Sequence, residues 1–425
     1  MTEVERDWIR QRRAAELANR DGRSPVTAGA RSVYRPGELL LSRAADDQLA
    51  DLLRTRYSGS RDDQRPVDSW RNAVGIPAEQ GDVNGRLETV DRVLWQVPAQ
   101  ADLPAVVREL RGRLSPDDHA AQVALNQVYF GEPLYQGGPG GEPYPVSPVE
   151  LAAVPEGVTP GAPDLAALDT GLPADWETLH PPLAGWLTPD LDNRNVLVAQ
   201  DGSGKLATEA GHGMFIAGLI RRVAPGLVID PGRVLDPTGF GDDASIGAEL
   251  VETTAAVICL SLGGYTEDDA PPAALSAALA AKGRSVAVVA AAGNNDSGRP
   301  FWPAALKHVI AVAGYDSTGG GQAKTDFSNW GDWVDVCAPA VRVTSTYVQG
   351  IWPAHDGDRT FDGWARWSGT SFAAPLVAAE IARRRASAGR LVTGRQAALS
   401  LLAELDPAPW PELGLMYHPA LDVTG

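Results

Sequence analysis

The chain of 425 residues has few cysteines, fewer basic than acidic side chains, and no long apolar run. Its two cysteines, Cys259 and Cys337, lie inside apolar segments, so we expect buried thiols, with a disulfide as the less favoured alternative. The 37 basic and 54 acidic residues give a net charge of −17. Such a balance repels phosphate backbones and anionic lipid, so nucleic acid is not an expected partner.

The first residues lack the features of a targeting segment. Residues 1–13 are charged throughout and contain no apolar core of a signal peptide. No apolar stretch elsewhere reaches membrane-spanning length. We therefore expect residues 1–30 to be a polar leader, and the protein to be cytoplasmic and to have no membrane partner.

Alternating strand and helix patterns begin after this leader. Apolar runs predict strands at 37–43, 92–98 and 123–130. Apolar residues at helical spacing predict helices at 46–57 and 103–114, so that the two helices alternate with the three strands. This order predicts a small α+β domain of the ferredoxin-like kind over residues 31–130, with one hairpin strand unplaced.

Glycine and proline then dominate residues 131–163, which include Gly-Gly-Pro-Gly-Gly at 137–141. This composition breaks helices and strands and predicts an interdomain linker. From residue 164 to 425, apolar strands alternate with helices, which predicts a mostly parallel sheet covered by helices on both faces. The expected strands are 164–171, 195–199, 232–236, 255–262 and 285–294.

Four polar residues lie at the ends of these elements. Asp169 and Asn294 each follow a strand, and His212 stands between two glycines where a helix opens. Ser371 precedes an apolar helix, and we expect Pro375 in the first turn of that helix, where a missing N–H costs little. Taken singly, each could be a turn or capping residue. Together they supply a carboxylate, an imidazole, an amide and a hydroxyl, the groups that acyl transfer requires.

The segments around these residues resemble the subtilisin-like serine proteases. The matching motifs are Leu-Asp-Thr-Gly at 168–171, His-Gly-x-x-Ile-Ala-Gly at 212–218, Ser-Leu-Gly-Gly at 261–264, Ala-Ala-Gly-Asn at 291–294 and Gly-Thr-Ser-Phe-Ala-Ala-Pro at 369–375. Lesser matches lie between them, at 326–331 and 334–339. The sedolisin relatives carry a glutamate in place of the histidine, so His212 favours the subtilisin-like group.

The resemblance implies a three-layer α/β/α sandwich and a serine endopeptidase mechanism through an acyl-enzyme intermediate. It assigns Ser371 as nucleophile, His212 as base and Asp169 as its orienting carboxylate. Asn294 would donate to the oxyanion. The residues that it implies for binding of a polypeptide substrate are Ser261, Leu262, Gly263, Gly264, Ala291, Ala292 and Gly293. Catalysis needs no cofactor, and structural Ca²⁺ is common in the family, although no ligand run identifies a site.

Two features leave alternatives open. Met214 stands where family members usually carry a hydroxyl residue, so a peptide-binding or regulatory pseudoprotease is the alternative to an active enzyme. By position, residues 31–130 resemble an inhibitor-type prodomain, which would make the protein a zymogen; the alternative is a substrate-recruiting domain. With no signal peptide and two buried thiols, we expect an enzyme that processes a restricted intracellular substrate.

Overall fold

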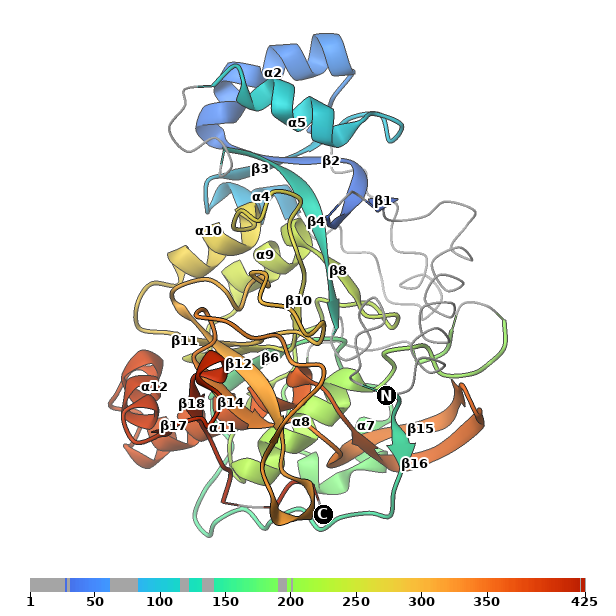
Figure 1. The fold of residues 1–425 in the computed structure, drawn as a ribbon, viewed down its shortest axis with the longest axis vertical. Coiled ribbons are helices and arrows are strands. Elements are labelled where there is room, and N and C mark those ends of the chain that lie inside the picture. The colour runs from blue at the N-terminus through green and yellow to red at the C-terminus, as the bar shows by residue number, and fades with distance from the viewer. Residues whose placement is uncertain are drawn as a thin grey trace.

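The computed structural model describes residues 27–28, 31–61, 83–114, 122–131, 141–189, 197–199, 202–420 and 422–424 (Figure 1). Within this part of the chain, no helix is long and apolar enough to cross a membrane. The predicted leader falls almost entirely outside it. Both cysteines are buried and free, and burial raises the pKa of each thiol to about 12, as expected for small core side chains.

A nine-stranded sheet forms the centre of the C-terminal part. Seven strands lie parallel to their neighbours, in the order β18 (Leu415–Met416), β14 (Val336–Pro339), β12 (Val309–Asp316), β11 (Ala287–Ala291), β9 (Val257–Leu260), β6 (Leu165–Leu168) and β7 (Ile229–Asp230). Two short strands, β13 (Ala323–Lys324) and β17 (Asp406–Pro407), add antiparallel pairs. The predicted mostly parallel sheet is confirmed.

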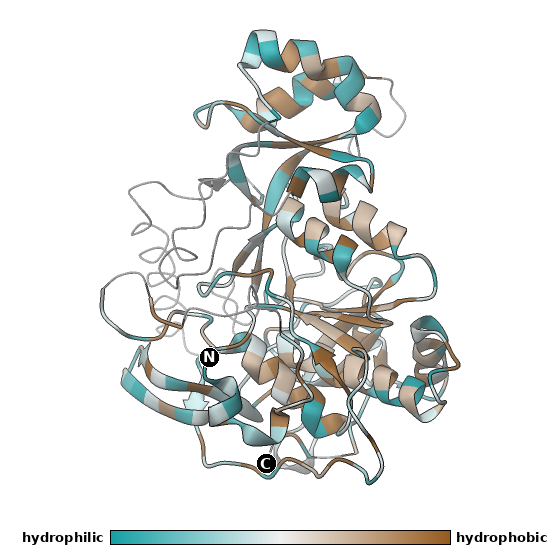
Figure 2. Ribbon diagram, turned by 180° about the vertical axis from the view of Figure 1, so that it is seen from behind, coloured by the Kyte–Doolittle hydropathy of each residue, from teal (hydrophilic) through white to brown (hydrophobic). Residues whose placement is uncertain are grey.

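Helices cover both faces of this sheet because its strands are apolar on both sides. In β9, Val257 and Cys259 join one core cluster, whereas Ile258 and Leu260 join another. The first cluster contains side chains of α8 (His212–Val223), α11 (Thr370–Ser387) and α12 (Gly394–Leu402), and the second contains those of α9 (Asp243–Glu252) and α10 (Ala273–Ala281). Hydrophobic residues accordingly concentrate in the central strands (Figure 2). The architecture is the three-layer α/β/α sandwich that the sequence predicted.

The N-terminal unit has its own sheet and core. Its described elements are β1 (Thr27–Ala28), β2 (Val33–Ser42), α2 (Arg43–Tyr57), α4 (Val83–Glu88), β3 (Arg92–Gln96), α5 (Leu103–Arg111) and β4 (Val123–Gly131). Strand β2 pairs antiparallel with both β3 and β4. This order is compatible with the predicted ferredoxin-like arrangement. An antiparallel bridge between Ser60 and Gln96 lies where a fourth strand would begin, and residues 62–82, which follow, are outside the described residues.

The C-terminal end of β4 leaves this unit and enters the larger one. It pairs antiparallel with β8 (Phe240–Asp242) and with β10 (Leu262–Gly263). In Figure 1, β4 runs from the upper unit down toward the central sheet. One six-stranded sheet therefore joins the two units.

A long hairpin, β15 (Val343–Ala354) and β16 (Gly357–Trp367), carries β5 (Tyr144–Pro145) as a third strand. This short strand lies inside the predicted linker, whose residues 132–140 are outside the described part. Proline does not prevent the pairing, because β5 is an edge strand where an N–H donor is dispensable.

Two predicted strands are not found as such. Residues 232–236 form no strand: Arg233 makes isolated bridges only, and the Asp236 Oδ1 accepts from the N–H groups of Thr238 and Phe240, which closes a turn. Pro231 and Pro237 flank this stretch and interrupt strand pairing. Within 195–199, Val198 makes a single bridge to Leu206, while 195–196 lie outside the described residues.

Candidate active site

Asp169 and His212 form a buried carboxylate–imidazole pair. Asp169 follows the last residue of β6, and His212 is the first residue of α8. The Asp169 Oδ1 lies 2.8 Å from the His212 Nδ1, and both side chains are at most 1% exposed. A carboxylate so placed fixes the imidazole tautomer that carries its proton on Nδ1 and directs Nε2 away from the carboxylate.

Hydrogen bonds from backbone N–H groups to the Asp169 and Thr170 side chains fix the strand end and the helix start. The Thr170 N–H donates to the same Asp169 oxygen at 2.7 Å, and the Thr170 hydroxyl accepts from the Gly213 N–H at 2.9 Å. A Cβ on Gly213 would lie 2.6 Å from the Gly171 carbonyl oxygen, so only glycine permits this approach. Gly213, one of the two glycines that flank His212, thus allows α8 to begin close to the end of β6.

Ser371 is the second residue of α11 and lies at a helix N-terminus, as the sequence predicted. Its hydroxyl donates to the Ser261 carbonyl oxygen at 3.1 Å. In return, the Ser261 hydroxyl donates to the Ser371 carbonyl oxygen at 2.9 Å. These two reciprocal bonds join the start of α11 to the residue between β9 and β10.

The expected place of Pro375 is wrong. We placed it in the first turn, but α11 begins at Thr370, so Pro375 is an interior residue. A proline has no N–H to donate to the carbonyl four residues before it, which here belongs to Ser371. The Ser261 hydroxyl supplies that carbonyl with a partner instead, and this explains how the helix tolerates the proline.

Aromatic side chains surround the imidazole. The Phe372 ring centroid is 5.4 Å from that of His212, and the Trp367 ring meets His212 edge-on at 5.7 Å. Because Phe372 directly follows Ser371, the start of α11 and the start of α8 face one another across these rings.

Asn294 is bound to the same helix start. Its Oδ1 accepts from the Thr370 N–H at 2.9 Å, and the Thr370 hydroxyl accepts from the Gly293 N–H at 3.1 Å. With Oδ1 committed to Thr370, the NH₂ group occupies the other end of the side-chain amide.

Asn329 is a positioning residue that the sequence analysis missed. It is fully buried, donates to the Ala292 carbonyl oxygen at 2.8 Å, and accepts from the N–H groups of Asn295 and Ser297. It thus fixes the loop that carries Asn294. The signal for it lies in the lesser motif at 326–331, which contains Asn329.

The predicted substrate-binding edge is already paired with this chain. Gly131 lies opposite Leu262, and Phe130 lies opposite Gly263, in the antiparallel register of β4 and β10. Gly264 does not extend that pairing, because its N–H and C=O bond to the backbone of Trp302.

The remaining expected residues take buried positions. Ala291 and Ala292 are fully buried at the end of β11, and Gly293 has a φ of +95°. Met214 is also fully buried, and its carbonyl oxygen accepts from the Thr346 hydroxyl.

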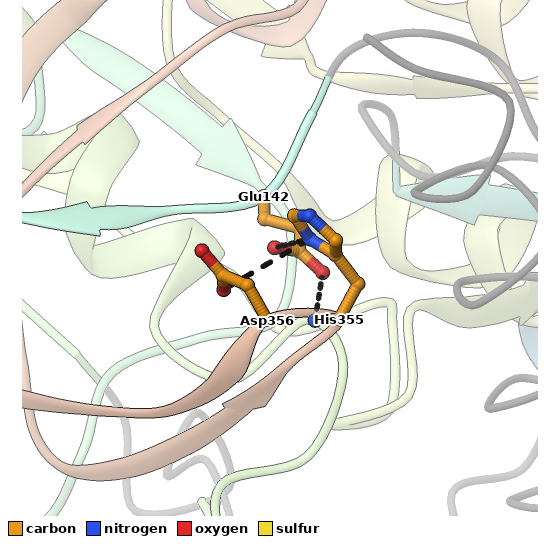
Figure 3. Close-up of side chains that lie close together, drawn as sticks. All are labelled: Glu142, His355 and Asp356. Carbon is orange, nitrogen blue, oxygen red and sulfur yellow. Dashed lines mark hydrogen bonds and ion pairs between the residues drawn. The ribbon is translucent and has the colours of Figure 1, made fainter.

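One group among the described residues has the composition of a metal site: Glu142, His355 and Asp356 (Figure 3). The Arg359 guanidinium lies 3.0 Å from Glu142 and 2.7 Å from Asp356. The Arg359 guanidinium therefore already pairs with both carboxylates of this group. Such a group does not favour Ca²⁺, which prefers a set of oxygen ligands without a competing guanidinium.

Comparison with known proteins identifies the family. A model of the subtilase family matches residues 163–397. The chain belongs to the subtilase family. Subtilases are serine proteases and hence hydrolases. The matched span starts close to Asp164, and contains all four residues that the sequence analysis placed in the site.

Several named proteases are similar to this subtilase. A thermophilic serine proteinase of Bacillus sp. (strain AK1) is 35% identical over 53% of this chain and 53% of its own length. Thermitase of Thermoactinomyces vulgaris is 33% identical over 56% of this chain and 80% of its own length. Subtilisin Savinase of Lederbergia lenta is 31% identical over 56% of this chain and 81% of its own length. The chain thus spans about half the length of the first relative. The crystal structure of a cold adapted subtilisin-like serine proteinase has a TM-score of 0.45 at 24% identity, covering 62% of this chain and 92% of that one.

Proposed function

We propose that this subtilase is an active serine endopeptidase with Ser371 as its nucleophile. The observation that carries the proposal is the buried Asp169–His212 pair, with the helix start that bears Ser371 facing it. A serine hydroxyl is a poor nucleophile without an adjacent base, and His212 is the base that this site offers. Asp169 would stabilise the imidazolium that forms when His212 takes the proton.

Activation requires one local change. In this structure the Ser371 hydroxyl donates to the Ser261 carbonyl oxygen, so it must rotate toward the His212 Nε2 before it attacks a peptide carbonyl. The tetrahedral oxyanion would then be stabilised by the Asn294 amide and by the Ser371 N–H at the start of α11. Collapse of this intermediate expels the amine, protonated by His212, and leaves an acyl-enzyme for water to hydrolyse.

A pseudoprotease is the second candidate, because the Ser371 hydroxyl is bonded away from the base and Met214 replaces the usual hydroxyl residue. A small fluorophosphonate probe distinguishes the two. We expect it to label wild type and not Ser371→Ala, and we expect wild type alone to cleave an unfolded polypeptide. A wild-type protein that neither labels nor cleaves, with the N-terminal unit removed as well as present, would establish the peptide-binding pseudoprotease.

We further propose that the N-terminal unit inhibits the peptidase in cis. Strand β4 occupies the edge of β10, where an extended substrate would add as a strand. The interface is reinforced by polar contacts: the Asn126 side chain accepts from the Ala244 N–H at the start of α9, and Arg35 pairs with Asp242 at 3.1 Å. Tethering raises the effective concentration of such an inhibitor to the millimolar range for short flexible linkers, about 10⁻³ M in order of magnitude.

Two fragments test this proposal. Residues 31–131 should inhibit residues 141–425 in trans, and the catalytic fragment should begin at 141 because a later start would remove β5. If the N-terminal fragment fails to inhibit, and its absence abolishes cleavage of the native substrate without loss of folding, it is a recruiting domain. The restricted substrate and the cytoplasmic location stay predictions, which proteomic identification of cleaved proteins in lysate and fractionation of the native cells would test.

A further inference from the structure

Residues Gly141 to Pro145, here called the strap, bind along the β15–β16 hairpin. Tyr144 and Pro145 pair with Arg366 and Ala365 as strand β5. At one end of the strap, the Gly141 carbonyl oxygen accepts from the indole N–H of Trp367 at 2.8 Å. The strap is therefore bound to the hairpin through both backbone and side chains.

Glu142 is the anchor of the strap. Its side chain is fully buried, with Oε1 accepting from the His355 backbone N–H and Oε2 lying 2.9 Å from the His355 Nδ1 (Figure 3). Arg359 adds an ion pair to the same carboxylate at 3.0 Å. A buried carboxylate is costly unless it is paired and hydrogen-bonded, and Glu142 meets both conditions only while the strap is seated.

Arg359 binds the strap at two further points. It donates to the Pro143 carbonyl oxygen at 3.0 Å, and its guanidinium lies 3.8 Å from the centre of the Tyr144 ring, a cation–π contact. Only 9% of the Arg359 side chain is exposed, so these interactions are largely shielded from solvent.

The strap joins parts of the hairpin that are far apart along its strands. Gly141 contacts Trp367, the last residue of β16, whereas the next residue, Glu142, contacts His355 at the turn. Consecutive Cα atoms are only about 3.8 Å apart. The hairpin must therefore curl so that its turn and its base meet at the strap, and the register shift between Thr346 and Gln349 provides an irregularity in β15.

The base of the hairpin in turn contacts the candidate catalytic base. The Trp367 ring meets His212 edge-on, with an interplanar angle of 90°, and it also packs against Phe215 and Phe372. The opposite strand of the hairpin base bonds to α8, through the hydroxyls of Ser345 to Phe215 and of Thr346 to Met214. The imidazole is thus held at Nδ1 by Asp169 and at its ring by Trp367.

We propose that Trp367 is a positioning residue for His212 and that the strap, anchored by Glu142, fixes Trp367 in that position. This inference rests on the proposed peptidase function. The indole N–H is fixed by the Gly141 carbonyl, and Trp367 is only 1% exposed, so the buried ring cannot rotate without losing that bond. Loosening the strap would free Trp367 and widen the range of His212 ring orientations, while the edge of β10 that would bind substrate stays unchanged.

The test compares three variants with wild type. Each protein is the full chain, and any inhibition by the N-terminal unit is relieved in the same way for all four. Trp367→Phe keeps an aromatic ring but removes the donor to Gly141. Glu142→Gln removes the charge that pairs with His355 and Arg359. Asp356→Asn is the matched control: Asp356 is exposed, and although it pairs with Arg359 and lies 4.0 Å from His355, its replacement leaves the contacts of Glu142 with both residues in place. The measurements are kcat and KM for a chromogenic peptide, the pH profile of kcat/KM, and thermal unfolding.

We expect Trp367→Phe and Glu142→Gln to lower kcat by roughly tenfold with KM nearly unchanged, since misorientation of a catalytic group by a fraction of an ångström costs turnover rather than substrate binding. The acidic limb of the pH profile should also move in both, and Asp356→Asn should behave as wild type. A role in folding alone would change thermal unfolding without moving the pH profile.

Wild-type kcat and an unmoved pH profile in Trp367→Phe would overturn the inference, even if Glu142→Gln fails to fold. An equal loss in Asp356→Asn would also overturn it, because the strap would then not be the cause. Failure of the proposed function looks different: wild type itself would show neither turnover nor fluorophosphonate labelling, and the inference would fall with it.

Discussion

Phe130 and Gly263 lie opposite each other in adjacent antiparallel strands, although the first belongs to the N-terminal unit and the second follows a core strand of the peptidase sheet. The Phe130 side chain packs in a cluster that spans the two units, and its ring is 4.8 Å from that of Phe240 in an edge-on contact. This single residue thus contributes both backbone pairing and apolar contact to the interface.

Phe130→Ala should therefore weaken inhibition by the N-terminal unit. Truncation of a buried aromatic anchor at an interface typically costs 2 kcal/mol or more, so the inhibition constant of fragment 31–131 should rise by about thirtyfold or more. Steady-state inhibition of fragment 141–425 measures this constant. Gln48→Ala is the matched control, because Gln48 is exposed on α2 and its amide bonds only within that helix.

An unchanged inhibition constant in Phe130→Ala would show that the pairing of β4 with β10 does not carry the inhibition. The contacts of the N-terminal sheet with α9 and α10 would then be its source, since Leu40 and Leu94 form a cluster with residues of both helices.

Asn294→Ala should reduce turnover while leaving substrate binding nearly intact. Removal of the corresponding oxyanion-hole asparagine in subtilisin, a member of this family, costs about 10²–10³ in kcat, and we expect a loss of the same order here. Because Asn294 also accepts from the Thr370 N–H, Asn294→Asp is the informative companion. It retains an oxygen for Thr370 but lacks the NH₂ donor, so it should be as inactive as the alanine variant.

Kinetics with a peptide substrate and thermal unfolding of both variants separate the two roles. If Asn294→Asp keeps wild-type kcat, the NH₂ group is not an oxyanion donor, and Asn294 serves only to hold the start of α11.

The fold and the candidate triad were predictable because their signals are local. Apolar runs of strand length and helical spacing mark the elements, and Asp169, His212 and Ser371 sit directly at the ends of such elements. The contact between Asp169 and His212 follows once both lie at the same end of the sheet.

The remaining features depend on contacts between segments far apart in the sequence. Gly141 and Trp367 have no local pattern that predicts their hydrogen bond, and a proline-rich stretch gave no reason to expect β5. The place of Pro375 was wrong for the same reason: its missing N–H is offset by Ser261, a partner that the sequence around the proline cannot reveal.

Asp243 should give the protein a specific pH dependence of stability. Burial raises the pKa of this carboxyl from its ordinary value of 3.8 to about 6, despite hydrogen bonds from the N–H groups of Ala274 and Leu275, which lower the pKa. Below pH 3.8 the carboxyl is protonated in both states and adds no cost. Between 3.8 and 6 the unfolded state releases the proton first, so stability falls as pH rises, by up to about 3 kcal/mol above pH 6.

Asp243→Asn in a Ser371→Ala background, which prevents self-digestion, removes this dependence. As the pH rises from 4 to 7, we expect the thermal unfolding midpoint of the Ser371→Ala parent to fall relative to that of the same protein with Asp243→Asn. The altered hydrogen bonds at position 243 should add a difference in midpoint that does not change with pH. Asp332→Asn, at an exposed position, serves as the control. A difference between parent and Asp243→Asn that does not vary with pH would show that the carboxyl titrates at its ordinary value.

Ser261→Ala should destabilise the protein through the carbonyl of Ser371. That carbonyl is buried at the start of α11, and Pro375 cannot donate to it, so the Ser261 hydroxyl is its partner at 2.9 Å. Leaving a buried acceptor unsatisfied costs about 1–3 kcal/mol, which sets the expected loss of unfolding free energy.

In Pro375→Ala the new N–H at position 375 can make the regular helical bond to the same carbonyl. The Ser261→Ala change should therefore cost much less when it is added to Pro375→Ala than when it is made alone, a coupling that thermal or denaturant unfolding of the two single variants and the double variant measures. Equal costs in the two backgrounds would mean that the Ser261 hydroxyl stabilises the site by another route, and that the proline in α11 is tolerated without its help.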